Sequence, residues 1–208
     1  MENPKTFARP KLTLWFPQLL SIHNKSLRGF TSHALTHAPA YWWTTYSSLK
    51  HHTVDERGEG GRVRHAQKCA VLSISVAEAL SLSSIDRDLL ISASFLHDIC
   101  CRGADDIPES PKTVYNHPML VQTRLQTIID RYTVGAYDEH EWMDDLFGII
   151  ESHMGKWGPR VPVTDLEKLF HLIDYVASRS FIQIKLPEDA RAERRSTVSR
   201  ILRRLRQT

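Results

Sequence analysis

Residues 65–82 contain neither glycine nor proline, and this uninterrupted stretch constrains the fold of the chain more than any other feature. Its apolar side chains recur at helical spacing, at Ala66, Ala70, Ile74, Ala77 and Leu80. Such spacing is typical of an α-helix with one buried face. Ser83 and Ser84 end the segment and can cap a second helix. The apolar stripe of that second helix runs through Leu89, Leu90, Ala93, Leu96, His97 and Cys100.

The rest of the chain continues the helical pattern. A loop rich in glycine, proline and acidic residues covers 102–116, and helices are predicted over 117–132, 139–154, 165–180 and 190–205. Only 181–184, with the sequence Phe-Ile-Gln-Ile, resembles a strand, and it is short. The sequence therefore predicts an all-α helical bundle in a single domain.

Three regions are expected along this domain. Residues 1–40, interrupted by four prolines, form an irregular extension in which 12–20 is the expected helix. Residues 41–185 form the main domain, and 186–208 form a basic amphipathic helix packed on it. With 208 residues, of which 41% are hydrophobic and 25% are charged, the chain can bury a sizeable core.

Charge and cysteine content limit the location and partners of the chain. No apolar run approaches the roughly 20 residues that cross a bilayer, and the N-terminus lacks the apolar segment of a secretory signal. Three cysteines, two of them adjacent, cannot form a disulfide framework. We therefore expect a cytoplasmic protein without a membrane partner. The net charge of +3 is too small to argue for nucleic-acid binding by itself, although seven arginines fall within 191–206.

Several histidines and acids stand where a helix would place core residues. His97 lies on an apolar stripe, and Asp174 directly follows Leu172-Ile173. A carboxylate buried among such neighbours costs several kcal/mol unless it is paired or bound to a metal. The other residues that could join these two in one site are His65, Asp98, His117 and His153. Imidazole and carboxylate ligands suit Mn, Fe, Co, Ni or Zn, whereas Ca and Mg favour oxygen ligands alone.

The order of these residues resembles the HD superfamily of metal-dependent phosphohydrolases, whose pattern is a His, then His-Asp, then a distant Asp. His65, the His97-Asp98 pair and Asp174 match that pattern. The Gly60-Gly61 pair before His65 is similar to the phage-like and exoribonuclease-like branch of the family. Two further segments are similar to the additional histidine motifs of two-metal members, Asn116-His117-Pro118 and Ser152-His153-Met154.

The resemblance implies an HD-type helical bundle that holds two divalent transition-metal ions. It implies that Asp98 bridges the ions and is the central catalytic residue. It also implies that His65, His97 and Asp174 hold the first ion, and that His117 and His153 hold the second. Enzymes of this family cleave phosphate esters with metal-activated water. We therefore expect a phosphohydrolase that acts on phosphoester or phosphoanhydride bonds of nucleotides.

The chain departs from the family after the His-Asp pair, where Cys100-Cys101 stand in place of the frequent Gly-Lys. The missing lysine leaves Arg102 or Lys156 as the expected cation at the substrate phosphate. Loops beside the predicted ligands supply the other expected substrate contacts, which are Lys50, His51, His52, Trp157 and Arg160. A base can stack on an indole ring while neighbouring cations hold phosphate.

The sequence keeps two alternatives open. The basic C-terminal segment and the glycine pair before His65 favour a nuclease, such as a 3′–5′ exonuclease on single-stranded nucleic acid. The absent Gly-Lys favours a degenerate, non-catalytic HD module that binds a nucleotide. Whether the chain forms a homo-oligomer is also left open.

Overall fold

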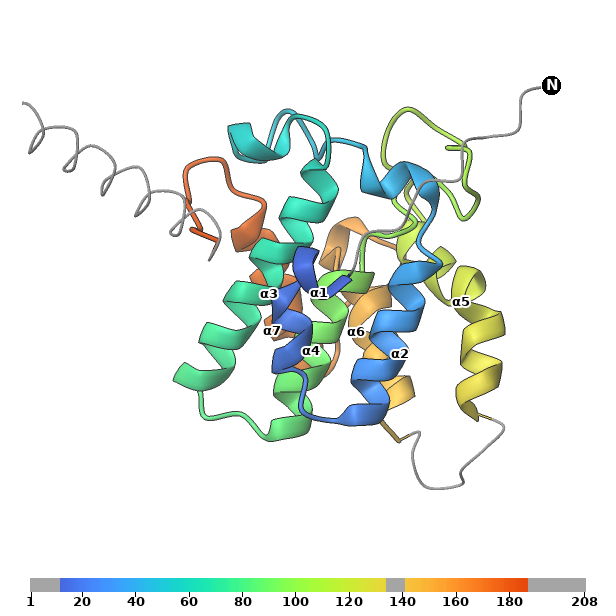
Figure 1. Ribbon diagram of the computed structural model, residues 1–208. Helices are drawn as coiled ribbons and strands as arrows, with labels where there is room; N and C mark the ends of the chain where they lie inside the picture. The colour runs from blue at the N-terminus through green and yellow to red at the C-terminus, as the bar shows by residue number, and fades with distance from the viewer. Residues whose placement is uncertain (1–11, 134–140, 187–208) are drawn as a thin grey trace, which may run out of the picture.

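The computed structural model describes residues 12–133 and 141–186, which fold as a bundle of α-helices (Figure 1). In chain order the elements, with η for short 3-10 helices, are α1 (Leu12–Trp15), η1 (Pro17–Ser21), α2 (Lys25–Thr36), η2 (Ala40–Trp43), η3 (Val54–Glu56), α3 (Gly61–Ala79), α4 (Ser84–Leu96), α5 (His117–Thr133), α6 (Glu141–Ser152), η4 (Gly155–Trp157) and α7 (Asp165–Ala177). Within the described ranges no strand forms, 181–184 included, and one isolated bridge joins Cys101 to Gly103. The predicted all-α class is confirmed.

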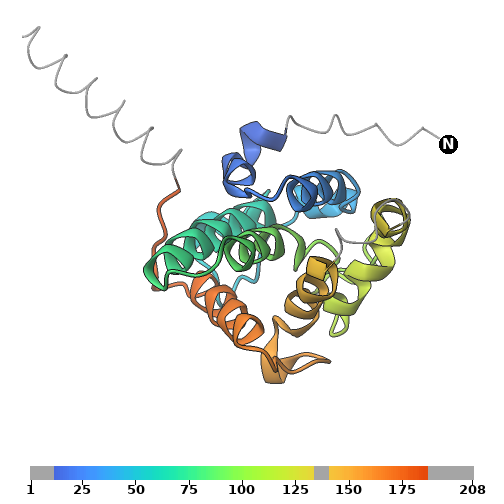
Figure 2. The same cartoon turned by 90° about the horizontal axis from the view of Figure 1, so that it is seen from below.

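α4 is the central helix of the bundle. It contacts α2, α3, α6 and α7, and in Figure 2 α3 and α4 lie between the blue N-terminal helices on one side and α6 and α7 on the other. Every residue from Asp88 to Cys101 is buried. A helix enclosed in this way can be apolar on all its faces. α4 therefore carries the two residues that follow it, His97 and Asp98, into the protein interior.

Local capping signals set where several helices begin. The side chain of Ser83 accepts a hydrogen bond from the Asp86 N–H at the start of α4. Thr164 and Glu167 form a capping box at the start of α7. Caps of this kind each stabilise a helix by about 1 kcal/mol. The ranges predicted for α5, α6 and α7 agree with the structure to within a few residues at each end.

The expectation of an irregular segment over 1–40 is wrong for α2. The prolines that suggested irregularity lie outside this helix, and Asn24 caps its first turn. Leu27, Phe30, Ala34 and Leu35 are fully buried at helical spacing. Farther upstream, the ring of Phe16 packs against Phe95 of α4 with centroids 5.0 Å apart. The described part of the N-terminal region therefore belongs to the same hydrophobic core as α3–α7.

Gly61 allows the backbone around η3 to pass close to the start of α3. A Cβ atom at Gly61 would lie 1.8 Å from the carbonyl oxygen of Glu56, so no larger residue fits. The preceding Gly60 has φ +73°, in the left-handed region that glycine adopts without cost. This close approach brings the Glu56 side chain against His65, one turn into α3.

Two of the regions predicted from the sequence extend beyond the described residues. The helix predicted over 190–205, and its packing on the domain, lie outside them, as do the first two residues predicted for α6. Among the described helices, none combines the length and the apolar character needed to cross a membrane.

Candidate metal centre

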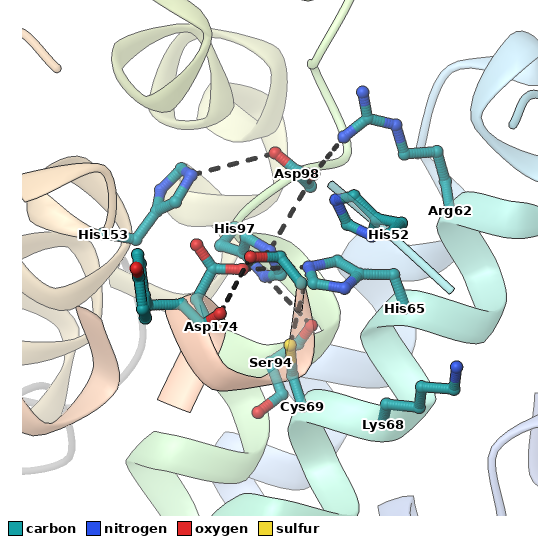
Figure 3. Close-up of polar contacts among 12 residues, drawn as sticks. His52, Arg62, His65, Lys68, Cys69, Ser94, His97, Asp98, His153 and Asp174 are labelled. Atoms are coloured by element: carbon teal, nitrogen blue, oxygen red, sulfur yellow. Dashed lines mark hydrogen bonds and ion pairs between the residues drawn. The ribbon is translucent and has the colours of Figure 1, made fainter. Parts of the chain in front are cut away.

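The six predicted metal ligands come together from five helices and the residues that adjoin them. His65 lies on α3, His97 and Asp98 follow α4, His117 begins α5, His153 follows α6, and Asp174 lies on α7. Figure 3 shows five of these side chains, those of His65, His97, Asp98, His153 and Asp174, turned toward one another. The structure thus assembles residues that are up to 109 positions apart in the sequence.

Asp174 joins the two histidines predicted for the first ion. Its Oδ1 lies 2.9 Å from His65 Nε2 and 3.6 Å from His97 Nε2. The side chain of Asp174 is one-fifth exposed, whereas both imidazoles are buried. The carboxylate therefore forms the border between the buried histidines and the solvent.

The two oxygens of Asp98 face different histidines. Its Oδ1 lies 2.9 Å from His117 Nε2 and 3.8 Å from His153 Nε2. Its Oδ2 lies 3.9 Å from His97 Nε2 and accepts a hydrogen bond from the buried guanidinium of Arg62. A single carboxylate thus lies between the two groups of imidazoles.

Backbone carbonyls orient three of the four imidazoles. Nδ1 of His117 and of His153 each lie 2.7 Å from a carbonyl oxygen, of Val114 and Ile150 respectively. Nδ1 of His97 lies 3.1 Å from the carbonyl oxygen of Ser94. When Nδ1–H donates to a carbonyl, Nε2 of the neutral ring is a free acceptor, which is the arrangement found in metal-ligating histidines.

Two features of these rings fit a bound cation. His97 Nε2 is buried and has no hydrogen-bond partner. The Nε2 atoms of His117 and His153 face each other at 3.3 Å, although each ring directs its Nδ1 to a carbonyl. His117 Nε2 also lies 2.9 Å from Asp98 Oδ1, so three potential ligand atoms converge on one point, and a buried acceptor without a partner, such as His97 Nε2, costs about 1–3 kcal/mol. The residues present therefore fit a metal ion, and the buried His and Asp clusters can hold one.

Glu56 supports His65 from the side opposite Asp174, a role that could not be predicted from the sequence. Its Oε2 lies 3.4 Å from His65 Nδ1 and also pairs with His52 Nδ1. Its Oε1 accepts from Lys68 Nζ at 2.6 Å and from Thr53 Oγ1 at 2.9 Å. The carboxylate is completely buried, and the lysine compensates its charge. The ammonium group of Lys68 supplies the positive charge beside Glu56 that a metal ion would otherwise supply. We therefore interpret the group formed by Glu56, His52 and Lys68 as a support for His65 rather than as a separate metal site.

Arg62 is a second residue whose role could not be predicted from the sequence. It lies three positions before His65 on α3 and is buried. Its Nη1 donates to Asp98 Oδ2, and its Nη2 donates to Thr113 Oγ1 at 2.8 Å. The resulting pair fixes the orientation of the Asp98 carboxylate.

Burial determines the charge state of the site. Burial, together with His97 and His117, lowers the pKa of His153 to about 3, and burial also lowers the pKa of His97. Both rings are therefore neutral near pH 7, as a ligand must be. For Asp98, burial opposes ionisation, but Arg62 and the adjacent histidines hold its pKa well below its usual range.

The pKa of His65 is raised, whereas those of His97 and His153 are lowered. Burial alone would lower its pKa, but contacts with Cys69, Asp174 and Glu56 raise the pKa of His65 well above its usual value. A proton on His65 therefore offsets part of the carboxylate charge when no metal ion does so.

A cavity of about 490 Å³ opens beside Asp174 and His153. Its wall includes His51, Trp157, His171 and Tyr175. The Trp157 ring, about half exposed, lies parallel to the Tyr175 ring with centroids 6.3 Å apart. Nδ1 of His171 lies 2.6 Å from the carbonyl oxygen of His153 and helps to fix the loop that carries this histidine. The cavity thus joins an aromatic surface to the candidate metal centre.

The predicted substrate contacts divide into two groups. His51 and Trp157 line the cavity, and Lys156 Nζ lies 5.0 Å above the Trp157 ring. The others lie elsewhere: Lys50 is exposed on the loop before His51, His52 turns inward to Glu56, Arg102 stacks on Tyr46, and Arg160 pairs with Glu151 and Glu167.

Comparisons with known proteins give no match to this chain: neither a family model, nor a curated protein, nor a solved structure is detectably similar to it.

Proposed function

We propose that the protein is a metal-dependent phosphohydrolase of the HD type that acts on nucleotides. The observation that carries this proposal is the position of Asp98, whose two oxygens face different imidazole groups. A carboxylate so placed suits a pair of ions about 3.5–4 Å apart, the separation found in two-metal phosphoesterases.

The proposed ligand sets follow from the contacts. His65, His97 and Asp174 would hold one ion, His117 and His153 would hold the other, and Asp98 would serve both. Ions such as Mn, Fe, Co, Ni or Zn suit this mixture of imidazole and carboxylate, and when bound they activate water and offset the charge of a phosphate.

The surrounding residues keep the ligands in the required form and orientation. Arg62 holds the Asp98 carboxylate, and its charge favours the ionised state. Carbonyl oxygens hold His97, His117 and His153 with Nε2 directed inward. Side chains that are pre-oriented in this way need no reorganisation when charge develops on a phosphate.

The adjoining cavity supports a nucleotide as the substrate. Its volume of about 490 Å³ lies within the range of about 300–1,000 Å³ that is usual for small-ligand sites. A base stacked on Trp157 would place its phosphate toward Asp174 and His153, with Lys156 at the rim.

A panel of phosphoesters tests this proposal. Protein stripped by a chelator and reloaded with Mn, Co, Ni, Zn or Mg is mixed with nucleoside monophosphates, triphosphates, cyclic nucleotides and a single-stranded oligonucleotide. We expect hydrolysis with at least one transition-metal ion and with a small nucleotide. His97→Ala and Asp98→Ala should abolish it and leave the helical circular dichroism largely intact.

The same panel separates the alternatives. Preference for the oligonucleotide would favour a nuclease. Metal-loaded protein that binds nucleotides and hydrolyses none of the panel would contradict the proposal and favour a binding module. His23→Ala, which changes an exposed histidine remote from Asp98, serves as the control variant.

A further inference from the structure

Cys69 lies one turn after His65 on α3, and its sulfur faces the ligands proposed for the first ion. The side chain is fully buried, and Sγ lies 3.6 Å from His65 Nε2. In Figure 3 this sulfur points toward the space between His65 and Asp174. One ligand atom from each of four residues lies within 4.8 Å of the others; the four are His65, Cys69, His97 and Asp174.

Three of the six separations among these atoms are close to the edges of a tetrahedron around one ion, and the other three are at most 4.8 Å. Zinc bonds of about 2.0–2.3 Å at tetrahedral angles place the ligand atoms about 3.3–3.6 Å apart. The observed separations are 3.6 Å for His65 Nε2 to Cys69 Sγ, 3.6 Å for His97 Nε2 to Asp174 Oδ1, and 2.9 Å for His65 Nε2 to Asp174 Oδ1. Shifts of a few tenths of an ångström would bring these contacts to the tetrahedral values.

A second observation points to a ligand at the same place. His97 Nε2 is buried, directed toward this group and without a hydrogen-bond partner. Among the described residues, Cys69 is the one cysteine that belongs to a group of candidate metal ligands. The sulfur of Cys100, by contrast, donates to the carbonyl oxygen of Leu120 at 3.7 Å.

We propose that Cys69 is an additional protein ligand of the first ion, beside His65, His97 and Asp174, and makes this position selective for Zn²⁺. On binding, the thiol gives its proton to solvent and the thiolate coordinates the ion. Thiolate ligands favour Zn²⁺ and disfavour Mg²⁺ and Mn²⁺. The inference rests on the metal centre proposed above and not on the hydrolysis.

The proposal assigns different roles to the two metal positions. His65, Cys69, His97 and Asp174 would supply four ligands to the first ion and the bridging Asp98 a fifth, so this position would be closed to substrate. Asp98, His117 and His153 supply three ligands to the second position, which leaves one open. The cavity is lined by one ligand of each position, Asp174 of the first and His153 of the second.

Absorption spectroscopy with Co²⁺ tests the proposal without reference to activity. Co²⁺ is titrated into metal-free protein, and the near-ultraviolet charge-transfer band of a thiolate–Co²⁺ bond is recorded. Wild-type protein and Cys100→Ser should both show this band, and Cys69→Ser should lose it. Absence of the band in Co²⁺-loaded wild-type protein, or its persistence in folded Cys69→Ser, would overturn the proposal.

Two further measurements keep the test decisive if Cys69→Ser does not fold. The variant Cys100→Ser/Cys101→Ser leaves Cys69 as the one cysteine of the chain and should retain the band. Competition between Zn²⁺ and Mn²⁺ in this double variant should favour Zn²⁺ at the first position. Loss of the band, or equal affinity for the two ions, would contradict the assignment. A band in a protein that hydrolyses no phosphoester would leave Cys69 a ligand and overturn only the proposed function.

Discussion

His117 Nε2 and His153 Nε2 lie 3.3 Å apart, with each Nδ1 directed to a backbone carbonyl. Two imidazoles that belong to different helical segments thus direct their Nε2 atoms to the same point, beside Asp98 Oδ1. This relationship is the basis of the proposed second metal position, because a cation at that point would be bound by all three atoms.

We predict that His153→Ala lowers the metal stoichiometry from two ions to one per chain. The variant leaves the ligands of the first ion in place and removes half of the imidazole pair. Elemental analysis after equilibration with excess Co²⁺ and gel filtration measures the stoichiometry. His23→Ala should retain two ions, and an unchanged stoichiometry in His153→Ala would argue for a single-metal site.

Proton release should distinguish the two positions. In metal-free protein the raised pKa of His65 keeps this ring protonated near pH 7, so the first ion must displace a proton. Its affinity should therefore rise with pH, because this proton and that of the Cys69 thiol, whose pKa burial raises to about 11, must both leave. His153, with its pKa lowered to about 3, is already neutral over about pH 5–8 and releases no proton to the second ion.

Calorimetric titrations in buffers of different ionisation enthalpy count these protons. His153→Ala isolates the first position and should release at least one proton per ion. Binding to this variant that releases no proton at pH 7 would contradict the protonated state of His65.

Glu56→Gln should weaken binding at the first position by about 10- to 100-fold, the usual cost of losing an outer partner of a ligating histidine. The amide keeps the shape of the side chain but removes the negative charge that faces His65 Nδ1. Competition with a chelating dye measures the affinity. Asp88→Asn is a matched control, because Asp88 is another completely buried carboxylate and its Oδ2 accepts from the backbone N–H of Asn24. Equal metal affinity in wild-type protein and Glu56→Gln would show that Glu56 does not contribute to metal binding.

Trp157→Ala should raise the KM for a nucleotide by about 5- to 150-fold, since stacking of a base on an aromatic ring contributes about 1–3 kcal/mol. The kcat should change little, because Trp157 is not among the proposed ligands. Steady-state kinetics with a nucleoside monophosphate and with glycerol phosphate measure the effect. Glycerol phosphate has no base, so its KM should be unaffected. Tyr115→Ala, which removes an exposed ring outside the cavity lining, should behave as wild type. An equal rise in KM for both substrates would show that Trp157 does not bind the base.

The sequence predicted those helices that are marked by signals within their own segment, namely apolar side chains at helical spacing and capping residues. Ser83 and Thr164 mark the starts of α4 and α7, and both lie where helix periodicity begins. α2 escaped prediction because nearby prolines suggested irregular structure, although Pro17 and Pro39 lie outside the helix. Local signals therefore identified most of the bundle, and the error arose where breaker residues flank a helix without entering it.

The order of His and Asp residues in the sequence identified the six proposed ligands. The residues that contact these ligands and hold them in place could not be identified in this way. Glu56 lies in a turn-like segment and meets His65 only because Gly61 allows the close approach of two backbones. Arg62 and Cys69 stand three positions before and four positions after His65, so helical spacing alone would place them near its face of α3. Their contact with Asp98 and with the His97–Asp174 pair depends on how α3 packs against α4 and α7.

Anomalous diffraction from crystals of the metal-loaded protein tests the central claim most directly. Data collected at the absorption edge of the bound metal locate each ion without assumptions about activity. We predict two peaks about 3.5–4 Å apart, one among His65, His97 and Asp174 and the other between His117 and His153, with Asp98 between them. Fully loaded crystals with no peak at these residues, or with one peak that Asp98 does not contact, would contradict the account.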